Sequence, residues 1–407
     1  MSEVLKPAAD WELQGILASC RDKGQPVEVA GAGSKRAIGR PMQTAGTISM
    51  QSYRGISLYE PNELVMSARA GTPLSQIEAE LAARGQMLAF EPTDLGPATS
   101  GAAGHQTIGG VFAANLSGAR RVVSGAARDH LIGVKGVNGA AEMFQSGGRV
   151  MKNVTGYDLV RGLCGSWGTL AVLTELTFKV LPWPESSATL LFAGLPDDLG
   201  AEVMCAAVGT PYEVSGAVHL PAALTARLEN ERLRTLGKSL TALRIENFPR
   251  SVVYRVEALR KALGVYGETA TLETVESVAL WAELRRLSVV SYSDATLLWR
   301  ISTAPKTGPK IVAQIKRQMP AEAFYDWSGG LIWLETPVSA DAGAADIRRA
   351  VAVHGGHATL IRAAPSIRAA VEVFQPLAPG VEKISRGLKA AFDPVGILNP
   401  GRMYSYI

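Results

Sequence analysis

Two glycine-rich turns constrain this chain more than any other feature. The first, residues 29–35 (VAGAGSK), ends a short apolar run, and the second, residues 107–118 (TIGGVFAANLSG), follows downstream. Glycine has no Cβ, so backbone N–H groups in such turns can approach phosphate oxygens closely. A lone Gly-x-Gly fits an ordinary strand-to-helix turn equally well. The pair, in this order, favours two backbone cradles for one phosphate-bearing cofactor.

The Rossmann dinucleotide motif does not fit the first turn. That motif needs Gly-x-Gly-x-x-Gly and then an acidic residue about twenty positions on, at the end of the next strand. Arg36 stands where the third glycine belongs, and the next strand-like run, residues 47–50, ends in Gln51 and Ser52. These residues argue against an NAD-type Rossmann site and favour a different nucleotide-binding fold.

Length and composition set further limits. A chain of 407 residues with 47% hydrophobic residues predicts two or three globular domains. The net charge of +4 gives no support for nucleic-acid binding. We find no signal-peptide pattern and no apolar run approaching the length of a membrane span. Cys20, Cys164 and Cys205 are scattered and form no Cys-x-x-Cys. This pattern predicts a reducing cytoplasm and no iron–sulfur or cysteine–zinc site within the chain.

The N-terminal part of the chain is predicted to alternate helices and strands. Asp10 is the expected N-cap of a helix ending near Gly24, and Thr107 is expected to begin a helix with unpaired N–H groups in its first turn. The predicted helices are residues 11–22 and 74–84, and the predicted strands are residues 27–30, 64–70, 131–137 and 168–180. Pro182 and Pro184 are typical of a domain boundary.

Residues 188–362 have a different pattern. Strand-like runs are interleaved with amphipathic helices, which predicts an antiparallel sheet with helices on one face, an α+β domain. The predicted strands are 189–193, 215–220, 240–245, 296–302, 331–335 and 358–361, and the predicted helices are 253–263, 278–287, 310–318 and 346–353. We therefore expect three parts: domain 1–184, an α+β cap 185–365 and a C-terminal segment 366–407.

The order of these motifs resembles the vanillyl-alcohol-oxidase-like, or PCMH-type, FAD-binding family. The resemblance rests on both glycine-rich turns, on residues 168–175 (GTLAVLTE), on residues 152–158 (KNVTGYD) and on the tail of residues 392–402. The last two match the lactate/glycolate branch of the family. The implied fold is α+β: an FAD-binding domain of two α+β subdomains, an antiparallel-sheet cap, and a tail that returns to the flavin domain.

In that family both turns hold the FAD pyrophosphate, and a backbone group near Val172 faces the flavin. Some relatives tether FAD through a histidine in the first turn. Here Ser34, Lys35 and Arg36 occupy that neighbourhood, so the resemblance implies noncovalent FAD. The implied FAD-binding residues are Gly31, Ala32, Gly33, Ser34, Lys35, Pro92, Thr107, Gly109, Gly110, Ala113, Ser117, Gly118, Val172 and Asn399.

Within the family, the chain resembles the FAD subunits of bacterial glycolate oxidases nearly end to end, through residues 147–153, 299–302, 326–330, 355–359 and 399–404. This resemblance implies oxidation of a small 2-hydroxy acid. It also implies a sister FAD subunit, an iron–sulfur subunit, and a cytoplasmic place that is peripheral on the bacterial inner membrane through the complex. The histidine-rich metal motif of the larger relatives is missing. His354 and His357 stand without an adjacent carboxylate, so no metal site is expected.

Oxidising a 2-hydroxy acid requires a cation for the carboxylate and a base for the hydroxyl proton. Arg300, in an apolar strand-like run, is the candidate for the carboxylate, because a guanidinium binds two oxygens at once. An ion pair at a strand edge is the equally weighted alternative. His105 and His357 are the candidate bases. His105 could equally be a loop or flavin-contact residue, and Tyr157 could hydrogen bond inside the flavin domain.

Three functions remain open at this point. The chain could be the FAD subunit of a glycolate-oxidising complex. It could be a structural or electron-relay subunit whose sister performs the oxidation, which the missing metal motif favours. It could also be a self-sufficient FAD oxidase of another hydroxy acid or an alcohol.

Overall fold

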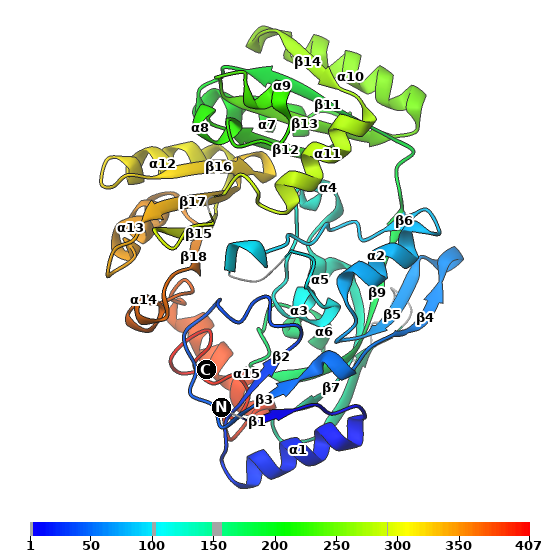
Figure 1. Ribbon diagram of the computed structural model, residues 1–407, viewed down its shortest axis with the longest axis vertical. Helices are drawn as coiled ribbons and strands as arrows, with labels where there is room; N and C mark the ends of the chain where they lie inside the picture. Colours follow the sequence, from blue (N-terminus) through cyan, green and yellow to red (C-terminus); the bar gives the residue numbers. More distant parts are fainter. Residues whose placement is uncertain (1–2, 100–102, 149–156, 291) are drawn as a thin grey trace. The chain divides into compact units, whose positions relative to one another are not determined.

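The computed structural model describes residues 3–99, 103–148, 157–290 and 292–407. Residues 152–156 of the motif shared with the lactate/glycolate branch lie outside these ranges. The chain divides into two compact units (Figure 1). Unit 1 comprises Met1–Leu116, Ala126–Trp183 and Glu372–Ile407, and unit 2 comprises Ser117–Gly125 and Pro184–Val371. Among the described residues, no helix has the length and apolar character needed to span a membrane.

The first subdomain of unit 1 is a parallel three-stranded sheet in the order β1 (Glu3–Leu5), β3 (Gly46–Ser49), β2 (Val27–Ala30). Leu13, Leu17 and Cys20 of α1 (Asp10–Asp22) are buried in one cluster with residues of β2 and β3. Ala9, not Asp10, is the N-cap of α1. The predicted cap was wrong by one position, and Asp10 instead lies in the first turn, where a carboxylate is favoured by the helix dipole.

The second subdomain of unit 1 is a five-stranded antiparallel sheet. Its order is β4 (Ile56–Glu60), β5 (Val65–Arg69), β9 (Ala171–Lys179), β7 (Leu131–Asn138), β8 (Met143–Gly147). Phe90, Phe112 and Phe178 pack together in its core with tilted rings; the ring centroids lie 5.4 Å apart for Phe90 and Phe112 and 5.6 Å apart for Phe112 and Phe178. The other elements are α2 (Leu74–Ala82), α3 (Ile108–Ala113), α5 (Ala127–His130), α6 (Leu159–Leu163) and the pair β6 (Gln86–Met87) and β10 (Leu181–Pro182).

The C-terminal segment returns to the first subdomain, as the family resemblance implies. After α15 (Pro379–Phe392), Leu398 forms a parallel bridge with Val27 of β2, and the Asn399 N–H donates to Val27 O at 3.1 Å. In Figure 1 the red C-terminal segment accordingly lies beside the blue strands of the N-terminus. The two ends of the chain therefore build one subdomain.

Unit 2 contains an eight-stranded sheet in the order β14-β11-β13-β12-β16-β17-β15-β18, and all its pairings are antiparallel. The strands are β11 (Ser186–Ala193), β12 (Val214–Leu220), β13 (Leu240–Asn247), β14 (Thr269–Leu272), β15 (Thr296–Ser302), β16 (Glu322–Asp326), β17 (Leu331–Pro337) and β18 (His357–Arg362). The prediction of an antiparallel cap sheet is confirmed. The short strands β14 and β16 were not predicted.

The helices of unit 2 cover both faces of its sheet. Because side chains alternate along β13, Thr241 and Arg244 point to opposite faces. Thr241 bonds His219, which packs against Gly200 of α7, whereas Arg244 lies over Trp281 of α11. The expectation of helices on one face was therefore wrong for α11. The helices are α4 (Arg121–Ser124), α7 (Asp197–Val208), α8 (Ala222–Thr225), α9 (Glu231–Arg234), α10 (Pro249–Leu263), α11 (Thr274–Arg285), α12 (Gly308–Lys316), α13 (Ala344–His354) and α14 (Pro365–Ala370).

Candidate functional site

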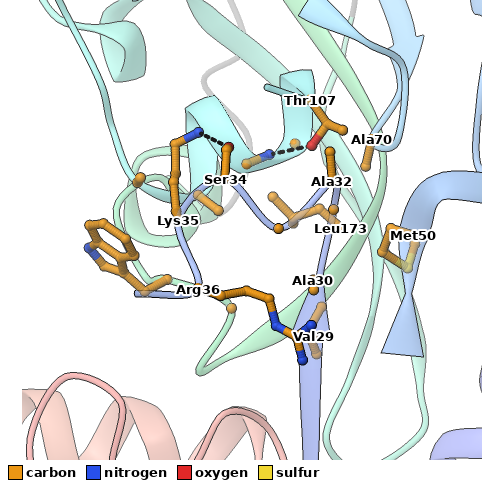
Figure 2. Close-up of a pocket in the computed structure, with 18 of the residues that line it drawn as sticks. Val29, Ala30, Ala32, Ser34, Lys35, Arg36, Met50, Ala70, Thr107 and Leu173 are labelled. Carbon is orange, nitrogen blue, oxygen red and sulfur yellow. Dashed lines mark hydrogen bonds between the residues drawn. The ribbon is translucent and has the colours of Figure 1, made fainter. Parts of the chain in front are cut away.

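A pocket opens in unit 1 where β2 ends and α3 begins (Figure 2). It comprises about 710 Å³ of empty space, part of it open to solvent. Its lining residues are Val29, Ala30, Gly31, Ala32, Gly33, Ser34, Lys35, Arg36, Met50, Ala70, Thr107, Gly109, Gly110, Ala113, Ala114, Trp167, Gly168, Ala171, Leu173 and Arg402. The two glycine-rich turns thus meet at one cavity.

The first turn presents open backbone donors. The N–H groups of residues 32–35 find no acceptor among the described residues. Gly33 has φ +86°, a conformation that glycine adopts without strain. Consecutive N–H groups in such a turn form a concave site that favours an anion.

The second turn differs from its prediction. Thr107 does cap α3, and its Oγ1 accepts from Gly110 N at 3.3 Å. However, Ile108 N donates to Thr72 O at 3.0 Å and Gly109 N to Ala70 O at 2.9 Å. The first turn of α3 is therefore already hydrogen bonded, because it packs on the residues after β5. The expectation of unpaired N–H groups there was wrong, and the open donors belong to the first turn.

Close backbone approach explains two of the glycines. A Cβ on Gly31 would overlap Thr107 Oγ1, and one on Gly109 would lie 2.8 Å from both the Cβ and the O of Ala70. Real Cβ atoms do not come so near to such atoms. Gly31 therefore allows the two turns to touch, and Gly109 allows α3 to pack on β5.

Lys35 places the only buried ammonium group among the described lining residues in this pocket. The residue is 8% exposed, and its Nζ donates to Gln106 Oε1 at 2.8 Å and to Ser34 Oγ at 3.4 Å. Figure 2 shows the side chain folded back over the turn towards Ser34. Burial lowers the pKa of Lys35 to about 7, Asp94 opposes that shift, and Arg402 adds to it.

The C-terminal tail supports the pocket from behind. Asn399 is fully buried; its Oδ1 accepts from Val29 N at 2.7 Å and its Nδ2 donates to Trp167 O at 2.8 Å. Asn399 thus joins two lining segments without lining the pocket itself. Arg402 does line it, donating to Lys35 O at 2.8 Å with its guanidinium 5.4 Å from the Trp167 ring centroid.

Four other residues implied to bind the cofactor lie away from the lining. Val172 is buried in the hydrophobic core, while its neighbours on β9, Ala171 and Leu173, face the pocket. Pro92 is buried and is not among the lining residues. Ser117 and Gly118 belong to unit 2.

Contacts with Trp327 and Glu246 help to hold the segment Ser117–Gly125 within unit 2. Trp327 Nε1 donates to Gly118 O at 2.9 Å, and Arg120 Nε donates to Glu246 Oε2 at 2.9 Å. The Arg121 guanidinium lies 4.4 Å from the Trp327 ring centroid. The sequence analysis placed this segment with the cofactor domain, and no sequence signal there indicates its partner.

Arg300 lies beside the same tryptophan. It is partly buried on β15, with its guanidinium 5.1 Å from the centroid of Trp327 and 6.0 Å from that of Trp333. No described carboxylate forms an ion pair with it. Burial lowers the pKa of Arg300 to about 10, the like charge of Arg121 contributes, and Asp326 opposes the shift. The described residues therefore do not contain the strand-edge ion pair that was the alternative role of Arg300.

The predicted bases lie in different units. His357, in register with Ser302 of β15, is in unit 2 with Arg300. Partial desolvation, then the charges of Arg300 and Arg121, lower the pKa of His357 below 6.5. His105 is exposed in unit 1. Tyr157 is 91% exposed, and its side chain forms no hydrogen bond with a described residue of unit 1, in contrast to one of the alternatives.

Sequence reasoning missed several residues at both sites. Arg402 lies in the quoted tail motif but was not assigned a site role, and Arg121 was not assigned one either. Trp167 and Met50 carry no motif of their own, and Leu173 lies in the quoted motif of residues 168–175 but was not assigned a site role. Over the described ranges, no group of three or more His, Cys, Asp or Glu side chains is arranged to hold a metal ion.

Known proteins identify the family. The chain is 35% identical to glycolate oxidase subunit GlcE of Escherichia coli over 97% of this chain and 96% of that protein. The chain belongs to the GlcE family. A family model described as "FAD binding domain" matches residues 2–147. Glycolate oxidase subunit GlcD of Bacillus subtilis is 26% identical over 99% of this chain and 88% of that protein. The GlcE family is thus one of FAD-linked proteins, and FAD is the cofactor.

Solved structures confirm the fold. A p-cresol methylhydroxylase structure aligns with a TM-score of 0.72 at 12% identity, over 99% of this chain and 88% of that one. A 4-ethylphenol oxidase of Gulosibacter chungangensis aligns with a TM-score of 0.71 at 15% identity, over 99% and 89%. The predicted PCMH-type FAD-binding fold with an antiparallel cap sheet is therefore confirmed for this GlcE family member.

The pocket suits FAD on its own geometry. Open N–H groups at residues 32–35 and a buried lysine with no described carboxylate partner favour the binding of an anion. Gly31 allows the two turns to touch, Gly109 allows α3 to pack on Ala70, and Ala171 and Leu173 provide an apolar wall. None of the described residues that line the pocket is a histidine or a cysteine.

Proposed function

We propose that this chain is the FAD-binding subunit of a heteromeric glycolate oxidase or dehydrogenase, which oxidises glycolate or a similar 2-hydroxy acid to the 2-oxo acid. The observation that carries the proposal is the end-to-end similarity to E. coli GlcE, together with a pocket whose turns suit a diphosphate. The similarity to GlcD supports a complex containing a sister FAD subunit. Residues 1–184 serve as the FAD domain, 185–365 as the cap and 366–407 as the returning segment.

In this proposal FAD would be held noncovalently and, when bound, would supply the acceptor for one hydride, which carries the two electrons, from the substrate carbon. The first turn, Thr107 and the glycines of α3 hold it, and Asn399 positions the strand end and Trp167 around it. Pro92, Ser117, Gly118 and Val172 stay candidates for contacts outside the pocket lining.

Arg300 is the proposed ligand of the substrate carboxylate. Its guanidinium has aromatic neighbours and no described carboxylate partner, so an incoming carboxylate can take both of its forked donors. His357, in the same unit, has a lowered pKa and is neutral at pH 7, so it can accept the hydroxyl proton. His105 is the second candidate for that base.

Electrons must then leave the chain. Cys20 and Cys164 are buried apart from each other, and Cys164 Sγ donates to Phe112 O at 3.0 Å. The three cysteines are too few and too dispersed for a cluster, which supports transfer to an iron–sulfur partner subunit. Through that complex the chain would work in the cytoplasm, peripheral to the inner membrane.

A second candidate function is an FAD-binding relay or structural subunit. The described residues contain no metal-binding group of the kind expected in the catalytic relatives, which favours substrate oxidation in the sister subunit. A stand-alone oxidase of another hydroxy acid or an alcohol is the third possibility.

The test measures dye reduction with glycolate by the purified chain and by the reconstituted complex, alongside the visible spectrum of each. Flavin in the isolated chain with turnover only in the complex supports the proposal. Full activity of the isolated chain would favour the stand-alone oxidase. Bleaching of only the sister subunit's flavin by glycolate would favour the relay.

A further inference from the structure

Lys35 is buried in the FAD pocket with neutral partners only. Its Nζ donates to the amide oxygen of Gln106 and to the hydroxyl of Ser34, and no described carboxylate pairs with it. Taking an ammonium group out of water is costly unless a counter-charge compensates it. We propose that the FAD diphosphate supplies this counter-charge, and that Lys35 takes up a proton when FAD binds.

The position of Lys35 points to the diphosphate. The side chain belongs to the turn with open N–H donors, and its Nζ lies 3.8 Å from where a Cβ on Gly110 would be, at the start of α3. Lys35 therefore reaches across from the first turn to the second. A dianion held by the N–H groups of residues 32–35 would lie in reach of the ammonium group.

Neither of the charged groups that act on Lys35, Asp94 and Arg402, is an ion-pair partner for its ammonium group, so the counter-charge is left to the ligand. The Asp94 carboxylate acts on Lys35 only at a distance, because its oxygens accept from Gly96 N at 3.0 Å and Gly104 N at 2.7 Å. Arg402, on the C-terminal tail, donates to Lys35 O and repels a second positive charge. Without a ligand the surroundings thus disfavour the ammonium form.

The pH dependence follows from linkage. Without FAD the pKa of Lys35 is about 7, and a bound dianion raises it. Affinity is then constant at low pH, where Lys35 is already charged. Above about pH 7 affinity falls by up to about tenfold per pH unit, until the pKa of the bound state is passed.

The experiment measures proton uptake by calorimetric titration of the flavin-free full chain in two buffers with different heats of ionisation. At pH 8 we expect about 0.9 proton per FAD, because that fraction of a group with a pKa of about 7 is neutral there. At pH 6 we expect about 0.1 proton. ADP-ribose carries the diphosphate without the flavin, so its binding should be accompanied by the same proton uptake by the protein. Binding of riboflavin should be accompanied by none.

Two variants and a control complete the test. Lys35→Met and Lys35→Arg should both bind without proton uptake, with Lys35→Met the weaker binder below pH 7. Lys383→Met, an exposed lysine of α15, should behave as wild type. Circular dichroism and the melting temperature of the flavin-free proteins verify folding.

Three results would overturn the inference. The first is unchanged proton uptake in a folded Lys35→Met or Lys35→Arg protein. The second is no uptake by wild type at pH 8. The third is uptake with riboflavin but not with ADP-ribose, which would assign Lys35 to the flavin ring. The inference rests on FAD binding and not on glycolate oxidation, so its failure leaves the proposed reaction untouched.

Discussion

Lys35 and Lys389 are both 8% exposed in unit 1, yet their surroundings differ. Lys389 Nζ donates to Asp393 Oδ2, Thr169 O and Leu398 O, at 2.7, 2.7 and 3.0 Å. Asp393 in turn accepts from three backbone N–H groups of the tail. Lys35 has two neutral partners and no carboxylate. The ammonium group of Lys389 thus has its counter-charge within the chain. The ammonium group of Lys35 has no described carboxylate partner, which suits the binding of an anionic ligand.

The largest expected effect comes from adding a side chain to the first glycine-rich turn. Gly31→Val places a side chain where a Cβ already overlaps Thr107, so the turns should separate and FAD binding should be lost. The released-flavin absorbance of purified protein measures this. Gly387→Ala, in α15 where nothing lies near the added Cβ, should keep its flavin. Retention of FAD by Gly31→Val would show that the two turns need not touch.

The next largest effect comes from breaking the buried ion pair between Lys389 and Asp393 in the tail. Asp393→Asn leaves Lys389 buried without its counter-charge, and loss of one partner of a buried pair typically costs about 3–5 kcal/mol. Thermal unfolding should show a markedly lower transition. Glu382→Gln, in the exposed pair with Arg386 on the same helix, should change stability by less than about 1 kcal/mol. Equal shifts of the melting temperature for both variants would mean that the buried pair stabilises the protein no more than the exposed pair does.

Arg300 extends the comparison to unit 2, since it too has no described carboxylate partner. Arg300→Lys replaces a fork by a point charge, which should cost about 1.5–3 kcal/mol in substrate binding. The KM of the complex for glycolate should rise tenfold or more, with flavin content unchanged. Arg317→Lys, an exposed arginine of unit 2, is the control. A changed melting temperature with unaltered kinetics would make Arg300 structural.

The smallest effect concerns the acid limb of the pH profile. Because the pKa of His357 is lowered below 6.5, a neutral base persists through pH 7, and kcat/KM should fall only as pH drops below 6.5. Arg300→Met removes one of the charges that lower this pKa, so the limb should move to higher pH. An unmoved limb in an active variant would exclude His357 as the base.

The sequence predicted those features that depend on local pattern. Strand β2 and the Thr107 cap were found, because glycine turns and capping residues have local causes. The return of the tail was implied by the family resemblance. The bonded state of Gly109 N was not found, since it depends on Ala70, distant in sequence. The tail motif was interpreted as cofactor contact, whereas Asn399 is a support whose partners lie 370 and 232 residues away.

The anchoring of Ser117–Gly125 in unit 2 has a practical consequence for dissecting the protein. A cloning boundary at residue 184 would yield a fragment lacking this segment, with Trp327 Nε1 deprived of Gly118 O and Glu246 deprived of Arg120. The complementary fragment would carry the nine residues Ser117–Gly125 with the partners of Gly118 O and of the Arg120 guanidinium deleted. Soluble expression of unit 2 alone would therefore require grafting residues 117–125 back onto residues 184–371 through an engineered linker.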